Sequence, residues 1–267
     1  MISVALAPMR FARFSVADQI AYGVVEGDES DPAGMTVTAI DGHPFAPFEL
    51  STARFPLTDI RLLPPVLPTK VIGIGKNYAD HAAEMGGQPP ATPVMFLKPS
   101  TSVIGDDEAI VLPAQSDRVE HEAELAVVVG RLARDVPAHR VAEVVLGVTG
   151  ANDVTARDLQ LADGQWTRAK GFDSFCPLGP WIATDVPFDD LAISSQVNGE
   201  ERQSARTSDM VHSVSDLVQF VSSVMTLLPG DIILTGTPAG VGPLRPGDEV
   251  SISIEQVGTL SNRVVRA

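Results

Sequence analysis

The sequence predicts a β-dominated α+β fold, with many short strands and few helices. Short apolar runs recur along the chain and are bounded by Gly, Pro, Asn and Asp, which is typical of strands separated by turns. Helical periodicity is clear chiefly in VSDLVQFVSSVMTLL, whose apolar side chains would share one face. With 267 residues, 44% of them apolar, the chain can bury one large core and a small appended domain. The predicted helix face consists of Leu217, Phe220, Val221 and Val224.

Residues 1–62 are expected to form a small N-terminal β-rich accessory domain. Apolar runs such as IAYGVVEG and MTVTAI alternate there with Asp, Gly and Pro. Residues 63–68 contain three prolines and would form a stiff connector. Residues 69–267 would then form the larger domain. Its predicted strands are KVIGIG, VMFLKP, ELAVVVG, VVLGVTGAND, WIATDV, AISSQVNG, DIILTG and EVSISIEQV.

Composition narrows the function classes. A formal net charge of −15 disfavours nucleic acid and anionic membrane surfaces as partners. The start MISVALAPMRFARF is too short and too interrupted for a secretory signal, and no apolar run approaches the ~20 residues of a membrane span, so a cytoplasmic protein is expected. Cys176, the only cysteine, excludes an internal disulfide and a thiolate metal cluster, and we interpret it as a small buried apolar residue.

Two glycine-containing motifs need separate consideration. VIGIGKNY has Tyr78 where a dinucleotide-binding fingerprint needs its third glycine, so a Rossmann site is not expected. TGTPAGVG, residues 235–242, lacks the Gly-Lys-Ser/Thr of a phosphate loop. Its backbone N–H groups could cradle a carboxylate, or the segment could be a tight turn between strands.

The segment NYADHAAEMGG predicts a short helix. Asn77 would be its N-cap with Asp80 three residues on, and two glycines would end it. His81 and Glu84 would share one face, where a carboxylate could orient the imidazole as a general base, although exposed pairs of this kind are common. The following GGQPPATP would make a mobile flap hinged at the glycines and stiffened by its prolines.

A metal site is predicted from three carboxylates. Glu122 and Glu124 lie two residues apart in EHEAELAVVVG. A strand through this segment would therefore direct both side chains to one face, together with Ala126 and Val128. Unpaired charges there would cost several kcal/mol each, so the carboxylates should be protonated, paired with cations or bound to a metal. Asp153 ends the strand before TARDLQ and is either a third ligand or a helix cap.

Thr155 and Asp158 have capping-box spacing in that segment, which places Asp153 at a strand-to-helix junction. Three oxygen donors without His or Cys suit Mg²⁺ or Mn²⁺ far better than Zn²⁺.

The order of several motifs resembles the fumarylacetoacetate hydrolase superfamily from about residue 69 to the C-terminus. The motifs are KNYADHAAEMG, FLKPST, HEAELAVVVGR, NDVTARDLQ, GQWTRAKGFDSFCPLGP, VNGE and LPGDIILTGTPAGVGPL. The chain looks most like the bacterial 2-hydroxyhepta-2,4-diene-1,7-dioate isomerase branch, which is similar to acylpyruvate hydrolases and oxaloacetate decarboxylases. The resemblance implies a mixed β-sandwich roll and a homodimer.

The resemblance also implies roles for individual residues. The metal ligands fall on the three carboxylates already grouped, the lid dyad on His81 and Glu84, and the active-site lysine on Lys170. A substrate contact falls on Thr237, beside Gly236 in TGTP. Lys98 in FLKP is another basic residue of a family motif, which would either contact the substrate or support a metal ligand. Three further positions have open roles. Glu120 could orient a metal-bound water or lie in solvent, and Arg168 and Gln88 are candidates for binding a second substrate carboxylate.

These residues would act on a 2-oxo acid, whose carboxylate and keto oxygens could chelate the metal. The metal and Lys170 would stabilise the resulting enolate. We rank isomerisation or decarboxylation of an unsaturated 2-oxo or enol dicarboxylate in aromatic catabolism first. Hydrolysis of an acylpyruvate or fumarylpyruvate and decarboxylation of oxaloacetate remain alternatives. A catalytically silent metal-binding protein would require a broken dyad or ligand set, and neither is broken here.

Overall fold

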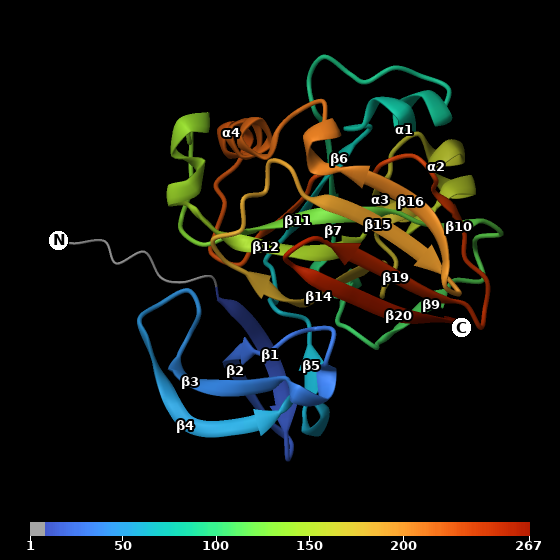
Figure 1. Ribbon diagram of the computed structural model, residues 1–267. Coiled ribbons are helices and arrows are strands. Elements are labelled where there is room, and N and C mark those ends of the chain that lie inside the picture. Colours follow the sequence, from blue (N-terminus) through green and yellow to red (C-terminus); the bar gives the residue numbers. More distant parts are fainter. Residues whose placement is uncertain (1–8) are drawn as a thin grey trace.

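Strands dominate the computed structural model, which describes residues 9–267, so the predicted β-dominated α+β class is confirmed (Figure 1). The first eight residues, which the sequence assigns to the N-terminal unit and in which no secretory signal is predicted, lie outside the described residues. No helix within the described range is long and apolar enough to cross a membrane.

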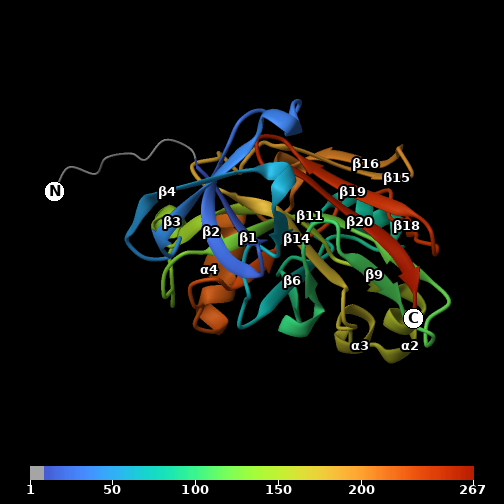
Figure 2. The same ribbon diagram turned by 90° about the horizontal axis from the view of Figure 1, so that it is seen from below.

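The N-terminal strands extend the main sheet rather than forming a separate one. β1 pairs antiparallel with β2 and also with β14, where Phe11 lies opposite Ile182 (Figure 2). The division of the chain after residue 62 therefore stays a prediction. The strands of this region are β1 (Arg10–Val16), β2 (Gln19–Glu26), β3 (Thr36–Gly42), β4 (Phe48–Pro56) and β5 (Arg61–Leu63), which meet β14 (Cys176–Ala183).

The twelve-stranded sheet runs in the order β4-β3-β2-β1-β14-β12-β11-β17-β6-β7, with β5 and β8 attached to β1 and β14. It is mixed, because β17 and β6 run parallel whereas β11 pairs antiparallel with both of its neighbours. The predicted strands match it closely, except that β14 begins five residues before WIATDV. The remaining members are β6 (Val71–Gly75), β7 (Val94–Lys98), β8 (Val103–Ile104), β11 (Ala123–Val129), β12 (Val145–Asn152) and β17 (Ile232–Leu234).

The chain also forms two smaller sheets, of which the larger packs against one face of the main sheet through β15, β19 and β20. Five strands run in the order β16-β15-β19-β20-β9, and three short strands in the order β13-β10-β18. The sequence did not predict β9, β10, β13, β16, β18 or β20. Their bounds are β9 (Ala109–Leu112), β10 (Val119–His121), β13 (Thr155–Ala156), β15 (Ala192–Val197), β16 (Glu200–Arg206), β18 (Gly242–Pro243), β19 (Glu249–Ile254) and β20 (Gly258–Arg266).

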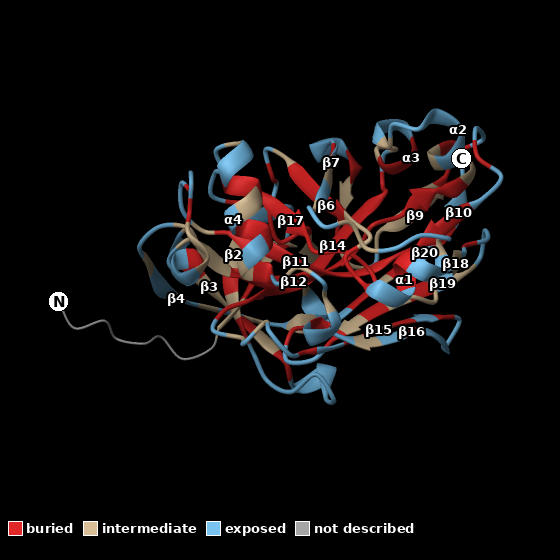
Figure 3. Cartoon of the chain, turned by 90° about the horizontal axis from the view of Figure 1, so that it is seen from above, coloured by how far each residue is buried: buried red, intermediate tan, exposed pale blue. Residues whose placement is uncertain are grey.

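β11 lies in the centre, and all of its side chains are buried (Figure 3). Leu125 and Val127 belong to the large apolar cluster between the sheets. Ala126 and Val128, on the other face, belong to a second cluster that includes Phe11 of the N-terminal strands. Alternating side chains of one strand therefore support two cores.

Within residues 9–267, four α-helices and five 3-10 turns surround the sheets. Helix α4 begins at the predicted segment, with Ser213 as N-cap and a capping box to Asp216. Leu217 and Val221 are buried as predicted, but Val224 is 48% exposed, so the predicted face is wrong at its last turn. The helices are α1 (Ala79–Glu84), α2 (Arg157–Asp163), α3 (Thr167–Lys170) and α4 (Val214–Val224), and the turns are η1 (Pro32–Gly34), η2 (Leu57–Asp59), η3 (Ser100–Ser102), η4 (Ala138–Glu143) and η5 (Thr207–Asp209).

Two predicted helix starts are wrong. Tyr78, not Asn77, is the N-cap of α1, because the Asn77 side-chain oxygen, which would have to accept a hydrogen bond from the helix, accepts one from the His212 amide at 2.9 Å instead. The capping box at Thr155 and Asp158 does not form: α2 begins at Arg157, and the Asp158 carboxylate accepts hydrogen bonds from the Ser116 hydroxyl and the Asp117 amide. In both cases the side chain that local spacing assigns to the helix cap forms hydrogen bonds with a distant segment instead.

Candidate active site

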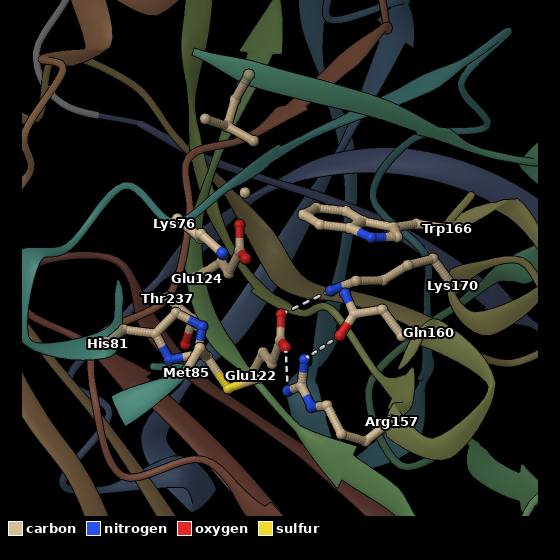
Figure 4. A pocket seen from close by; sticks show the side chains of 12 residues that line it. Lys76, His81, Met85, Glu122, Glu124, Arg157, Gln160, Trp166, Lys170 and Thr237 are labelled. Carbon is tan, nitrogen blue, oxygen red and sulfur yellow. Dashed lines mark hydrogen bonds and ion pairs between the residues drawn. The ribbon is translucent and has the colours of Figure 1, made fainter. Parts of the chain in front are cut away.

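One cavity collects polar side chains from four separate parts of the fold (Figure 4). The turn from β6 into α1, strand β11, helices α2 and α3, and the loop after β17 each contribute a wall. The glycines of VIGIG serve packing here, since a Cβ on Gly75 would lie 2.5 Å from the Trp166 ring. The lining residues are Ile74, Gly75, Lys76, His81, Met85, Glu122, Glu124, Arg157, Gln160, Trp166, Lys170 and Thr237.

Three buried carboxylates converge at the base of this cavity. Glu124 lies on β11, Glu122 immediately before it, and Asp153 immediately after β12. Because β11 and β12 pair antiparallel, Asp153 is brought beside Glu122, and its amide donates to the Glu122 carbonyl at 2.9 Å. One oxygen from each carboxylate lies within 4.8 Å of the others. The three predicted ligands are therefore close enough to share one ion.

Buried cations already neutralise part of this cluster. Lys170 donates to Glu122 at 2.7 Å and to Asp153 at 2.5 Å, and Lys98 forms a second ion pair with Asp153. Arg157 donates to Glu122 at 2.5 Å and to Glu120 at 2.7 Å. Carboxylates at such depth need these partners, because an unpaired buried charge is strongly destabilising.

The two glutamates differ in their electrostatic environment. Burial favours the neutral form of Glu122, but Lys170 and Arg157 outweigh it and hold its pKa below the ordinary value. Burial and the charges of Asp153 and Glu122 raise the pKa of Glu124 well above its ordinary value. Burial would lower the pKa of Lys170, yet Asp153 and Glu122 raise it, so this lysine stays charged. The cluster thus carries more negative charge than its cations balance.

This donor set fits a hard divalent cation. Three carboxylates without a histidine or thiolate are the oxygen ligands that Mg²⁺ and Mn²⁺ prefer. The raised pKa of Glu124 supports the same conclusion, because a bound cation would compensate the excess negative charge that favours its protonation.

The predicted dyad lies over the cavity. Nδ1 of His81 is 3.1 Å from Oε2 of Glu84, and His81 is 5% exposed. The Gly240 amide donates to the Glu84 carboxylate at 3.2 Å, which fixes this side chain from the opposite loop. The flap that follows α1 is also attached, since Nε2 of His212 lies 3.1 Å from the Pro90 carbonyl oxygen. The imidazole is therefore held in one orientation toward the cavity.

The TGTPAGVG loop does cradle carboxylates, but they belong to the protein. The Gly236 amide donates to Glu124 at 2.7 Å, and Gly240 holds Glu84 as described above. Thr237, which lines the cavity, accepts a hydrogen bond of 2.7 Å from the Gln203 side chain. The loop thus joins the carboxylate cluster to the dyad.

Three predicted positions lie elsewhere. Arg168 is half exposed and paired with Asp163, and Gln88 is exposed; neither lines the cavity. Glu120 is 1% exposed between Arg157 and Arg118, so the alternative that it lies in solvent is wrong. It orients Arg157, which in turn contacts Glu122.

Sequence reasoning missed several residues of the cavity. Arg157 and Gln160 lie in TARDLQ, whose spacing indicates only a helix start, and the Arg157 guanidinium donates to Gln160 at 2.6 Å. Lys76 follows VIGIG and is the first residue of the motif KNYADHAAEMG, in which only His81 and Glu84 receive predicted catalytic roles. Cys176 is buried, and burial raises its pKa to about 12, in agreement with its interpretation as a small apolar residue.

Two family models together match nearly all of the described residues. Residues 70–265 match the family model described as fumarylacetoacetate (FAA) hydrolase C-terminal, and residues 9–65 match the model described as Rv2993c-like, N-terminal. Protein Rv2993c of Mycobacterium tuberculosis is 54% identical over 97% of this chain and 98% of its own length. Rat mitochondrial oxaloacetate tautomerase Fahd2a is 42% identical over 92% of this chain and 85% of its own length.

Solved structures of related proteins superpose on this chain over nearly its whole length. The 2-hydroxyhepta-2,4-diene-1,7-dioate isomerase of Mycobacterium marinum superposes with a TM-score of 0.91 at 51% identity, covering 97% of this chain and 98% of that one. Maleylpyruvate hydrolase of a Sphingobium species, solved with Mn²⁺ and pyruvate, superposes with a TM-score of 0.79 at 33% identity, covering 97% of this chain and all of that one. The predicted sandwich-roll fold is thereby confirmed.

Proposed function

The chain belongs to the fumarylacetoacetate hydrolase family and is an enzyme of that family, and from this premise we propose that it is a divalent-metal-dependent isomerase of 2-oxo or enol dicarboxylates. The reaction we assign is isomerisation of 2-hydroxyhepta-2,4-diene-1,7-dioate. In it the 2-hydroxyl loses its proton, C5 gains one, and the two conjugated double bonds become a 2-oxo group and a double bond between C3 and C4.

The observation that carries the proposal is the position of one oriented base over the carboxylate cluster. His81, held by Glu84, lines the same cavity as Glu122, Glu124 and Lys170. Isomerisation requires a group that takes a proton and returns it to another atom, and a single imidazole can perform both transfers. Likeness to the M. marinum isomerase at 51% identity favours this reaction over hydrolysis.

A divalent ion held by Glu122, Glu124 and Asp153 would supply electrophilic stabilisation of negative charge on the 2-oxygen of the substrate. Lys170, a buried cation in the cavity, would donate a hydrogen bond to the same oxygen. The Thr237 hydroxyl accepts from Gln203, which leaves its own proton free for the substrate carboxylate. His81 would then move the proton between oxygen and carbon.

Tautomerisation of oxaloacetate is the second candidate. The rat relative of that name is 42% identical over 92% of this chain. The chemistry differs only in the receiving atom, since enol oxaloacetate gains its proton at C3. Acylpyruvate hydrolysis and oxaloacetate decarboxylation remain alternatives, because either would start from the same 2-oxo acid.

A product-resolved assay with Mg²⁺ or Mn²⁺ tests the assignment. The substrates are the hydroxyheptadienedioate, oxaloacetate and acetylpyruvate, with chelator-treated enzyme and the His81→Ala variant as controls. A shifted double bond, formed faster than any other product, supports the isomerase. Ketonisation of enol oxaloacetate alone would favour the tautomerase, acetate plus pyruvate a hydrolase, and carbon dioxide a decarboxylase.

A further inference from the structure

Lys76 occupies the turn between β6 and α1 and is the cation of the cavity without an acidic partner. The chain has four lysines, all within residues 9–267. Lys70 pairs with Asp231, and Lys98 and Lys170 pair with the carboxylate cluster. Among the described residues, Lys76 forms no ion pair and lines the cavity. Figure 4 shows its side chain directed into the cavity, on the opposite side from Trp166.

The backbone at Lys76 supports a role for its side chain. Its φ is 58°, a left-handed conformation that costs an ordinary residue about 1–2 kcal/mol and that glycine or asparagine adopts more readily. The turn is enforced by the neighbouring Asn77, whose amide donates to the carbonyls of His212 and Thr235. A position that favours glycine is therefore occupied by a residue with a long cationic side chain, and backbone strain of this kind clusters at functional sites.

Charge indicates what the ammonium would bind. Four carboxylates and three cations are buried in and beneath the cavity, and Arg118, which also pairs with Glu120, is exposed to screening by solvent. A divalent ion would therefore leave one formal positive charge among the buried groups. That surplus matches the carboxylate at the 2-oxo end of a substrate. A second carboxylate needs another cation, and the unpaired cation of the cavity is Lys76. The buried groups are Glu120, Glu122, Glu124, Asp153, Lys98, Arg157 and Lys170.

We propose that Lys76 binds the second carboxylate of the substrate and thereby selects 2-oxo dicarboxylates over 2-oxo monocarboxylates. This inference rests on the proposed function and adds the residue that determines substrate class. Arg168 is the competing residue from the sequence, but its guanidinium is bound to Asp163 at 2.5 Å and half exposed, outside the cavity lining.

The test measures ligand binding, which is independent of turnover. Mn²⁺-loaded protein is titrated calorimetrically with two matched pairs: 2-oxoglutarate against 2-oxopentanoate, and 2-oxoheptanedioate against 2-oxoheptanoate. Members of each pair share the 2-oxo acid end and the chain length and differ in the terminal carboxylate. The variants are Lys76→Met, Lys76→Arg, Arg168→Met and, as an exposed charge-removal control, Arg134→Met. Thermal unfolding of each variant checks the fold.

We expect wild-type protein to prefer the dicarboxylate in at least one pair by about tenfold or more, the range of a charge-assisted hydrogen bond. Lys76→Met should abolish that preference while retaining affinity for the monocarboxylate. Lys76→Arg, Arg168→Met and Arg134→Met should retain it. Three results would contradict the role of Lys76 and leave the proposed function standing: a dicarboxylate preference that survives in Lys76→Met, an equal loss of affinity for both members of a pair in that variant, or no preference in wild-type protein. Binding of no ligand at all overturns the proposed function and this inference with it.

Discussion

The side-chain amide of Gln203 donates hydrogen bonds to the Thr237 hydroxyl at 2.7 Å and to the Pro238 carbonyl at 2.8 Å. Its carbonyl oxygen accepts from the Ala123 amide at 2.9 Å and the Ser195 hydroxyl at 3.0 Å. Because the Ala123 amide can only donate and the Pro238 carbonyl can only accept, the orientation of the Gln203 amide is fixed. A strand of the second sheet thus positions the loop that lines the cavity.

Gln203→Met should therefore weaken substrate binding. Without the amide, the Thr237 hydroxyl can rotate away, and the loss of a buried hydrogen bond of about 1–2 kcal/mol corresponds to a KM roughly tenfold higher. We expect kcat to change less, because the base remains in place. Steady-state kinetics check this. Ser195→Ala removes a bond on the other side of Gln203 and is the control; an equal rise in KM there would contradict the positioning role.

Glu124→Gln should flatten the pH dependence of stability in metal-free protein. Burial and the neighbouring carboxylates raise the pKa of Glu124, so above the ordinary glutamate pKa the folded state binds more protons than the unfolded state. The contribution of Glu124 to stability is full below that ordinary value. It falls by about 1.4 kcal/mol for each pH unit between the ordinary pKa and the folded pKa. The variant should lose less stability over this range. Urea unfolding between about pH 4 and 9 measures it, and parallel curves for both proteins would refute the expectation.

Asp153→Asn should destabilise the metal-free protein. It leaves the buried Lys98 without its acidic partner and Lys170 with Glu122 alone, and an uncompensated buried charge costs about 3–5 kcal/mol in comparable sites. Metal-free Asp153→Asn should unfold at lower urea than wild-type protein, and Mn²⁺ should stabilise neither this variant nor Glu124→Gln as it stabilises wild-type protein. Stabilisation of both variants by Mn²⁺ to the wild-type extent would remove these residues from the ligand set.

His81→Ala should abolish turnover and preserve metal binding. Loss of a general base lowers kcat by about 10²- to 10⁴-fold, whereas none of the three carboxylates depends on the imidazole for its hydrogen bonds. Free Mn²⁺ measured by electron paramagnetic resonance gives the affinity, and the product assay gives the rate. Glu84→Gln, which retains the shape of the dyad, should be affected less. Full turnover in His81→Ala would exclude the dyad from the mechanism.

Oxalate should protect the flap from proteolysis. A hydrogen bond between the Pro90 carbonyl and the His212 ring joins residues 85–93 to the loop before α4. A mimic of the 2-oxo acid end should hold the flap closed over the cavity. Limited proteolysis of Mn²⁺-loaded protein should slow at this segment with oxalate, and His212→Ala should speed it without oxalate. Identical cleavage with and without oxalate would argue against closure.

Local patterns predicted much of this architecture. Strand β11 and its pair of glutamates follow from alternation and apolar content, which are properties of the segment itself. The helix starts at Asn77 and Thr155 could not be predicted, because their polar groups bind segments more than a hundred residues away or serve the strand end. Local spacing contains no information about such partners.

In the candidate site, too, some residues could be predicted from local sequence and others depend on contacts between distant segments. The three carboxylates come from residue types and a strand register, and the family resemblance brings in His81, Glu84 and Lys170. Lys76 and Arg157 lie in motifs that carry the family resemblance but receive no role from it, and Gln203 lies in none of those motifs. Their contacts depend on how separate strands and turns meet. Arg168 is a candidate only by its nearness in sequence to Lys170, and its side chain extends to Asp163 instead.

The shared face of β11 gives the N-terminal strands a part in the electrostatics of the cavity. Glu124, Ala126 and Val128 alternate along this face, and the last two lie in an apolar cluster with Phe11 and Ile40. Those two N-terminal side chains help to keep water from the far end of the strand, and a low local dielectric strengthens each charge interaction at its near end. A substitution at Phe11 would thus alter the polarity around the carboxylates although Phe11 does not contact them.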